Sequence, residues 1–221
     1  MYNVPRVKYA MRRYADAHGI DKPHVTWASP VWGNGAKALA WRITTHAHKT
    51  PSTRLDQTLV EIVLPVSFGT KVIRAAAGEV GVMEHPAGSN DGPRVSEYQA
   101  VTGAFRQPWC ASFVSWCYRQ AGYHGPLPAS PGWVPSWSSA ARHHVPAAFQ
   151  AVNKLTLRKG DYVTLWGNRH IELFNHWIVP GVLMACIGGN TAVTGRNSNG
   201  GAVCRTRRTV SEVTTAGRIR G

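Results

Sequence analysis

The chain has 221 residues, of which 43% are hydrophobic and nine are tryptophan, so it can bury one large or two small hydrophobic cores. Its formal net charge is +14, from 25 Lys and Arg against 11 Asp and Glu, and this excess favours anionic polymers or an acidic surface as partners. No run reaches the roughly 18 apolar residues of a membrane span, the first residues lack the hydrophobic region of a signal peptide, and the four cysteines lack the paired spacing of a disulfide framework or a zinc site.

Residues 1–65 are predicted to form a small domain of three helices. The segment 4–14 has apolar residues at helical spacing and a basic outer face, a turn rich in Gly precedes a second helix over 36–43, and a capping residue precedes a third over 52–63. This plan is similar to small peptidoglycan-binding domains found beside cell-wall hydrolases. The alternative is a helical extension that packs on the rest of the chain. Pro and Gly then break the helical period, which predicts a linker over 66–70.

The most informative segment is an amphipathic helix predicted to start at Cys110. Pro108 suits a first helical turn and Gly122 a helix end. One face of the helix carries Cys110, Val114, Cys117 and Ala121. A thiol at a helix N-terminus lies next to unpaired backbone N–H groups and the positive end of the dipole, and both favour the nucleophilic thiolate. Cys110 is therefore a candidate nucleophile, the alternative being a small buried hydrophobic residue. Cys117 is predicted to be core.

Three β-rich runs follow, over 160–167, 170–174 and 183–191, each bounded by Gly, Asn or Pro, and they predict successive strands of an antiparallel sheet. His170 opens the second run and Asn190 ends the third. A cysteine nucleophile needs an imidazole to move its proton, and the imidazole needs an orienting oxygen. His170 is preferred as the imidazole because it opens a strand; His176 is the alternative.

These motifs, in this order, resemble the CHAP family of cysteine, histidine-dependent amidohydrolases and peptidases, which cleave peptidoglycan. The resemblance covers residues 71–221. Its motifs are an approach helix over 79–84, the segment 90–98, Pro-Trp-Cys-Ala-Ser-Phe-Val-Ser-Trp-Cys over 108–117, Gly160-Asp161, His170 and Gly188-Gly189-Asn190. It implies an α+β fold with a papain-like catalytic domain, in which helices pack on an antiparallel sheet. It also implies that Cys110 is the nucleophile, His170 the general base and acid, and Asn190 the group that orients the imidazole.

The chain departs from the family pattern at Gly188, where many CHAP domains have Glu. The orienting role therefore falls to Asn190 alone, or to a carboxylate such as Glu172 or Asp161 whose position the sequence does not define. The acidic calcium-binding cluster that some relatives carry before the cysteine is also missing, since 103–106 has no carboxylate.

Further site residues are predicted around this centre. Gln107 is a candidate donor to an oxyanion, with Trp109 beside it. Trp137, like Trp133, could stack on sugar rings or instead hold its loop to the core. Glu172 shares a strand face with His170 and could flank the site or pair with an arginine.

No metal or cofactor is expected. The pairs His46/His48 and His143/His144 lack surrounding Cys or carboxylate ligands and are more typical of solvated side chains. Cys186 and Cys204 lie in predicted strands and could pair, although reduced thiols are favoured for a chain made in the cytoplasm.

The resemblance implies hydrolysis of a peptidoglycan amide bond through a thioacyl enzyme. With the two-part plan and the basic charge, it favours a monomeric phage endolysin that is made in the host cytoplasm, has no transmembrane segment and acts at the cell wall on peptidoglycan and anionic wall polymers. One alternative is a non-catalytic wall-binding or phage structural protein of the same fold. Another is a basic nucleic-acid-binding protein, but no nucleic-acid motif is present and nucleic acid is not the expected partner.

Overall fold

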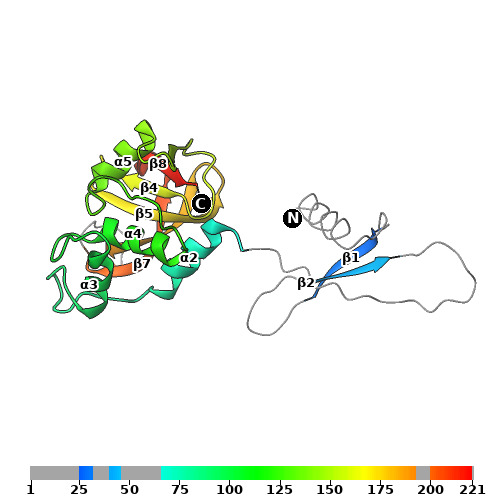
Figure 1. The fold of residues 1–221 in the computed structure, drawn as a ribbon, viewed down its shortest axis with the longest axis horizontal. Coiled ribbons are helices and arrows are strands. Elements are labelled where there is room, and N and C mark those ends of the chain that lie inside the picture. Colours follow the sequence, from blue (N-terminus) through cyan, green and yellow to red (C-terminus); the bar gives the residue numbers. More distant parts are fainter. Residues whose placement is uncertain (1–24, 32–39, 46–65, 193–199, 221) are drawn as a thin grey trace, which may run out of the picture. The chain divides into compact units, whose positions relative to one another are not determined.

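The chain divides into two units, residues 1–65 and 66–221. The computed structural model describes residues 25–31, 40–45, 66–192 and 200–220. In the first unit, β1 (Val25–Val31) and β2 (Ala40–Thr45) pair antiparallel, with an irregular register between Val25 and Ala28 (Figure 1).

The β2 strand corrects the prediction of a helix over 36–43. Trp41, Ile43, Thr44 and Thr45 are aromatic or β-branched, and such residues favour a strand over a helix. Alanines at 36, 38 and 40 suggested a helix, but the strand begins at Ala40. The helices predicted over 4–14 and 52–63 lie outside the described residues.

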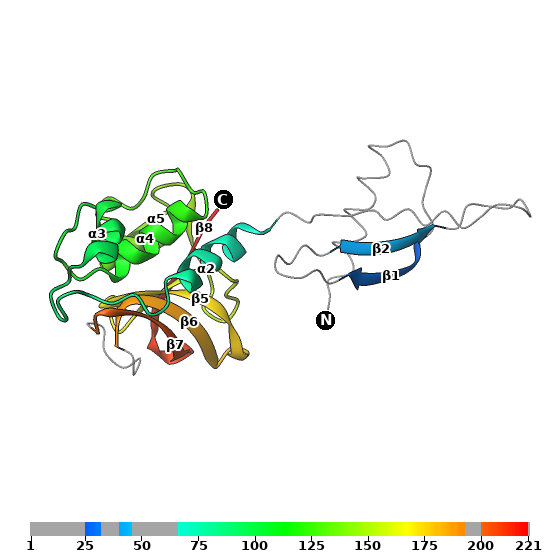
Figure 2. The ribbon, with the colours of Figure 1, turned by 90° about the horizontal axis from the view of Figure 1, so that it is seen from below.

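Residues 66–221 form an α+β unit with helices on an antiparallel sheet, as the sequence predicts for the fold class. The helices are α2 (Phe68–Gly78), α3 (Pro93–Ala100), α4 (Cys110–Gln120) and α5 (Val134–His143). Figure 2 shows α3, α4 and α5 as one layer and the strands β5, β6 and β7 as the other. None of the helices in the described ranges is long and apolar enough to cross a membrane.

The sheet has six strands in the order β3-β8-β4-β5-β6-β7, and every neighbouring pair is antiparallel. The strands are β3 (Phe149–Ala151), β4 (Tyr162–Leu165), β5 (His170–Val179), β6 (Leu183–Thr191), β7 (Ala202–Thr209) and β8 (Val213–Ile219). The three strands predicted in succession are β4, β5 and β6, so this part of the prediction is confirmed.

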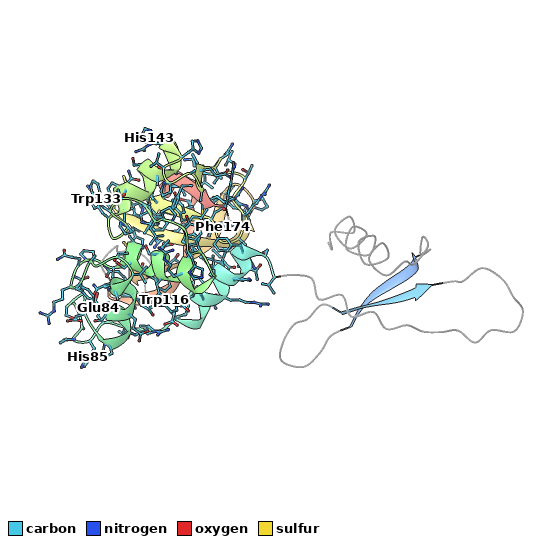
Figure 3. All side chains as sticks on the ribbon, in the orientation of Figure 1. Glu84, His85, Trp116, Trp133, His143 and Phe174 are labelled. Atoms are coloured by element: carbon cyan, nitrogen blue, oxygen red, sulfur yellow. The ribbon has the colours of Figure 1, made fainter. Side chains whose placement is uncertain are left out.

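Each face of the sheet contributes to a hydrophobic core. Successive residues of a strand point to opposite faces, and Tyr162 belongs to the core beneath the helices whereas Val163 belongs to a second core. The second core also holds Leu165, Phe174, Met184, Cys186 and Val213. Phe174, one of these residues, is labelled in Figure 3.

Trp137 lies in the core beneath the helices and does not face a substrate. Its ring is fully buried, with its centroid 5.9 Å from that of Tyr118 and 5.0 Å from that of Tyr162. Its indole Nε1 donates to the carbonyl of Pro131 at 2.9 Å, which holds the loop before α5 to the core. The prediction that Trp137 lines a substrate groove is therefore wrong. Trp133, at the edge of the unit in Figure 3, is 62% exposed.

The approach to α3 also differs from the prediction. Helix α2 ends at Gly78, and the helix expected over 79–84 is not formed because Gly81 has a φ of +99°. This segment runs alongside β7 instead: Gly81 N donates to Val203 O at 3.0 Å, and Val203 N donates to Val82 O at 2.9 Å. The linker expected over 66–70 contains the helix cap Ser67 and the first residues of α2.

All four cysteines are free and buried. Cys186 pairs with Thr206 and Cys204 with Gly188 in the ladder between β6 and β7, so the two cysteines are not opposite each other. The structure shows no bond between Cys186 and Cys204.

A close contact between two glycines joins α2 to the start of β4. Gly160 has a φ of +86°, and a Cβ on it would lie 2.4 Å from the Cα of Gly69. The carbonyl of Gly160 accepts from the Tyr118 hydroxyl at 2.7 Å, and the next residue, Asp161, pairs with Arg218 at 2.7 Å. Asp161 is thereby bound to Arg218, on β8, and is not the orienting carboxylate.

We predict that Gly160→Ala lowers the free energy of unfolding by at least about 2 kcal/mol, since the methyl group combines left-handed backbone strain with a clash against backbone that cannot move aside. Gly78→Ala is the matched control, because a Cβ there meets nothing within 4 Å, and alanine should be neutral or stabilising by up to about 1 kcal/mol. Urea unfolding of both variants checks this; equal stabilities would contradict the close contact.

Candidate active site

Cys110 is the first residue of α4, as the sequence predicts. No side chain caps this helix, and its first backbone hydrogen bond runs from Phe113 N to Trp109 O at 2.9 Å. The N–H groups of Cys110, Ala111 and Ser112 precede that bond and are the unpaired donors of a helix start. The residue is 4% exposed, whereas Cys117 is fully buried and belongs to the core. Unpaired backbone donors thus lie at the helix start that carries this almost buried thiol.

Trp109 holds the start of α4 in place through its contacts in the core. Its indole Nε1 donates to the buried carboxylate of Glu84 at 2.8 Å, and its ring stacks on Tyr98 at 5.6 Å between centroids. A Cβ on Gly189 would lie 2.6 Å from atoms of both Trp109 and Phe113, so α4 rests directly on the backbone of β6. Trp109 is fully buried and therefore positions Cys110 instead of contacting substrate, which corrects the prediction.

The two loops that flank the helix start are joined by one side chain. Gln99 Nε2, fully buried, donates at 3.0 Å to the carbonyl of Asn90 and at 3.0 Å to the carbonyl of Gln107. Its Oε1 accepts from Arg106 N at 3.3 Å. Gln107 itself is exposed, three residues before Cys110, so its side chain stays a candidate donor to a substrate.

His170 is the first residue of β5 and is fully buried. Its ring stacks on Trp166, with centroids 5.9 Å apart and an interplanar angle of 18°. It interacts with the sulfur of Cys110, and its Nε2 lies 3.3 Å from Oε1 of Glu172. Neither ring nitrogen makes a well-aligned hydrogen bond within the described residues. His176, the alternative imidazole, is exposed and six residues further along β5.

Glu172 lies between His170 and two residues of β7. Arg208 Nη2 donates to its Oε1 at 2.6 Å, Arg208 Nε lies 3.2 Å from both carboxylate oxygens, and Thr206 Oγ1 donates to Oε2 at 2.6 Å. The guanidinium also covers Trp166 at 4.8 Å from the ring centroid. The carboxylate is fully buried and has a partner for each oxygen.

Opposing effects set the protonation of this group. Burial disfavours the charged imidazole, but the Cys110 sulfur and the Glu172 carboxylate outweigh it and raise the pKa of His170 to about 9. Burial likewise disfavours the charged carboxyl of Glu172, but His170 and Arg208 outweigh it and lower its pKa to about 2. At neutral pH the ring is therefore an imidazolium between Cys110 and Glu172, and it can act as a proton donor.

Asn190, predicted to orient the imidazole, is fully buried near the end of β6. It has a φ of +50°, within an irregularity of the β6–β7 ladder between Gly188 and Thr191. Its Nδ2 donates to Asn90 Oδ1 at 3.5 Å, and its Oδ1 has no hydrogen-bond partner in the described part of the chain. The residue that contacts the imidazole is Glu172, one of the two carboxylates that the sequence left open.

Sequence reasoning missed the residues that support this centre, namely Glu84, Gln99, Trp166, Thr206 and Arg208. A signal existed for β7, because Arg205 and Arg207 alternate with Thr206 and Arg208 and a strand directs alternate residues to one face. The sequence does not say which face is buried, and the structure exposes Arg205 and Arg207.

Comparisons with models of known families, with characterised proteins and with solved structures find no match. Among the described residues, no three or more His, Cys, Asp or Glu side chains cluster in a way that could hold a metal ion.

We predict that Cys110→Ser lowers the pKa of His170 below its wild-type value of about 9, because the variant removes the sulfur whose interaction raises this pKa, while burial still disfavours the imidazolium. Cys117→Ala, on the same helix, is the control and should leave this pKa unchanged. An NMR titration of the imidazole ¹⁵N signals measures it, with the His170 signal assigned as the one that His170→Gln removes. An unchanged value in Cys110→Ser would show that the sulfur does not act on the ring.

Proposed function

We propose that this protein is a cysteine-dependent hydrolase of amide bonds in bacterial peptidoglycan, of the CHAP type and acting as an endolysin. The observation that carries the proposal is the buried row Cys110, His170, Glu172 at an uncapped helix N-terminus. A nucleophile, an imidazole and a carboxylate in this order are the parts that acyl transfer through a covalent intermediate requires.

The proposed reaction passes through a thioacyl enzyme. The Cys110 sulfur attacks the amide carbonyl, and the N–H groups of the first turn of α4 stabilise the oxyanion. The His170 imidazolium gives its proton to the leaving amine, and the amide C–N bond breaks to leave a thioester on Cys110. The neutral imidazole then takes a proton from water, whose oxygen attacks the thioester carbonyl. The C–S bond breaks, which frees the Cys110 sulfur and leaves the imidazolium as at the start, and the product leaves as a carboxylic acid that ionises to a carboxylate. Glu172 holds the imidazole throughout.

Charge supports an anionic polymer as the substrate. The chain carries a formal net charge of +14, and ion pairs with arginines occupy the carboxylates of Glu79, Asp91, Asp161 and Glu172. Arg205 and Arg207 remain exposed on the edge strand β7. This favours the phosphate-bearing polymers of a cell wall. Wall binding by residues 1–65, a monomeric state and synthesis in the host cytoplasm are part of the same proposal.

The rival proposal is a wall-binding or phage structural protein without turnover. The missing Glu at position 188 favoured it. Glu172 provides a carboxylate at the imidazole from the neighbouring strand, and this observation supports the catalytic proposal instead.

We predict that Cys110→Ser lowers the release of soluble fragments from purified peptidoglycan by about a thousandfold or more, because loss of the nucleophile removes the covalent route. Cys117→Ala, buried on the same helix, should keep most of the activity while lowering stability. Mass spectrometry of the fragments identifies the bond by its new amine and carboxyl ends, and so separates an N-acetylmuramoyl–L-alanine amidase from an endopeptidase.

Two results would contradict the proposal. The first is full activity of Cys110→Ser. The second is wild-type protein that sediments with insoluble walls but releases no fragments, which would support the rival proposal.

A further inference from the structure

The space beside His170 is filled by a side chain of β5, whereas the neighbouring strand β6 has a glycine there. Glu172, on β5, occupies it with a fully buried carboxylate. On β6, Gly188 follows Ile187, which pairs with Leu173 of β5, so the glycine lies alongside Glu172. A Cβ on Gly188 would lie 2.7 Å from Glu172 Cγ and 3.0 Å from its Oε1. A side chain at 188 would therefore enter the volume that Glu172 now fills.

Backbone conformation does not explain this glycine. Its φ lies outside the left-handed region that other residues avoid, unlike that of Gly160 or Gly201. What the missing side chain provides is a passage across β6. Glu172 is on β5, while its partners Thr206 and Arg208 are on β7, two strands away.

Strands in a sheet are spaced about 4.8 Å apart, so β5 and β7 are roughly 10 Å apart. Glu172 and Arg208 span that gap with hydrogen bonds of 2.6 Å. The side chains of Glu172 and Arg208 can cross β6 only at a position that carries no side chain, and Gly188 is that position.

We infer that this space accepts one carboxylate, that Glu172 is a positioning residue which holds the His170 imidazole through it, and that position 188 can supply the same carboxylate when position 172 is emptied. The inference rests on the proposed function for its effect on turnover. The contact with the imidazole is independent of any substrate, and this allows the two to be tested separately.

Full-length variants test it, with two measurements on each: the pKa of His170 by NMR and fragment release from purified peptidoglycan. Glu172→Gln keeps the shape and removes the charge, and Glu172→Gly empties the space. In both, the pKa should fall toward or below the ordinary histidine value of about 6.5, and fragment release should fall by about a hundredfold or more.

The deciding variant is Glu172→Gly/Gly188→Glu. It should return the pKa of His170 toward the wild-type value and raise fragment release at least about tenfold above Glu172→Gly, a coupling that independent sites would not show. The matched control, Glu172→Gly/Gly188→Gln, fills the same volume without charge and should recover neither. Glu172→Gly/Gly188→Asp is the second variant, with a shorter reach to the same anchoring groups.

Equal recovery by the Gln control would overturn the inference, because volume would then suffice. Folded Glu and Asp double variants that both leave the pKa at the value of Glu172→Gly would overturn it as well. If the double variants do not fold, Glu172→Gln decides: an unchanged pKa in that variant overturns the positioning role. The expected pKa pattern in a wild type that releases no fragments would instead refute the proposed hydrolysis and leave the positioning role supported.

Discussion

The ion pair between Glu172 and Arg208 is the interaction on which the rest of the site depends. Burying a carboxylate costs several kcal/mol unless other groups compensate, and here Arg208, Thr206 and His170 all bind the same two oxygens. Without Arg208, the pKa of Glu172 would rise, because His170 would then oppose the cost of burial without the guanidinium. Without Glu172, Arg208 would be a buried cation that has lost this carboxylate. Arg208 therefore acts on the charge of His170 through Glu172.

The reacting residues Cys110 and His170 could be predicted from the sequence, because their positions follow from local sequence signals. A proline before Cys110 and a glycine after the helix marked α4, and glycines and asparagines marked the ends of β4, β5 and β6. His170 could be assigned because it opens a strand. Each of these signals lies within a few residues of the feature that it marks.

The carboxylate could not be assigned, because its place depends on the register of three strands. Glu172, Gly188 and Arg208 are distant in sequence and meet only once β5, β6 and β7 align. Asn190 was expected to orient the imidazole, and that role stays a prediction: the residue lies in an irregular part of the β6–β7 ladder with a φ of +50°, and its Nδ2 donates to Asn90. The segment 79–84 was assigned as helix by resemblance, where Gly81 in fact breaks the helix and pairs with β7. Local propensity likewise overrode the expected helix at β2.

The dipeptide Gly188-Gly189 determines how much of the protein lies between α4 and the buried side chain of Glu172. Gly189 lets Trp109 and Phe113 sit on one side of the β6 backbone, and Gly188 lets Glu172 cross on the other. At this rung a single peptide layer, with no side chain of its own, separates the helix that carries the nucleophile from the buried ions. The electrostatic interaction between charges on its two sides is weakened little by such a thin layer of buried backbone. A change of charge on one side of this layer therefore acts electrostatically on groups on the other side.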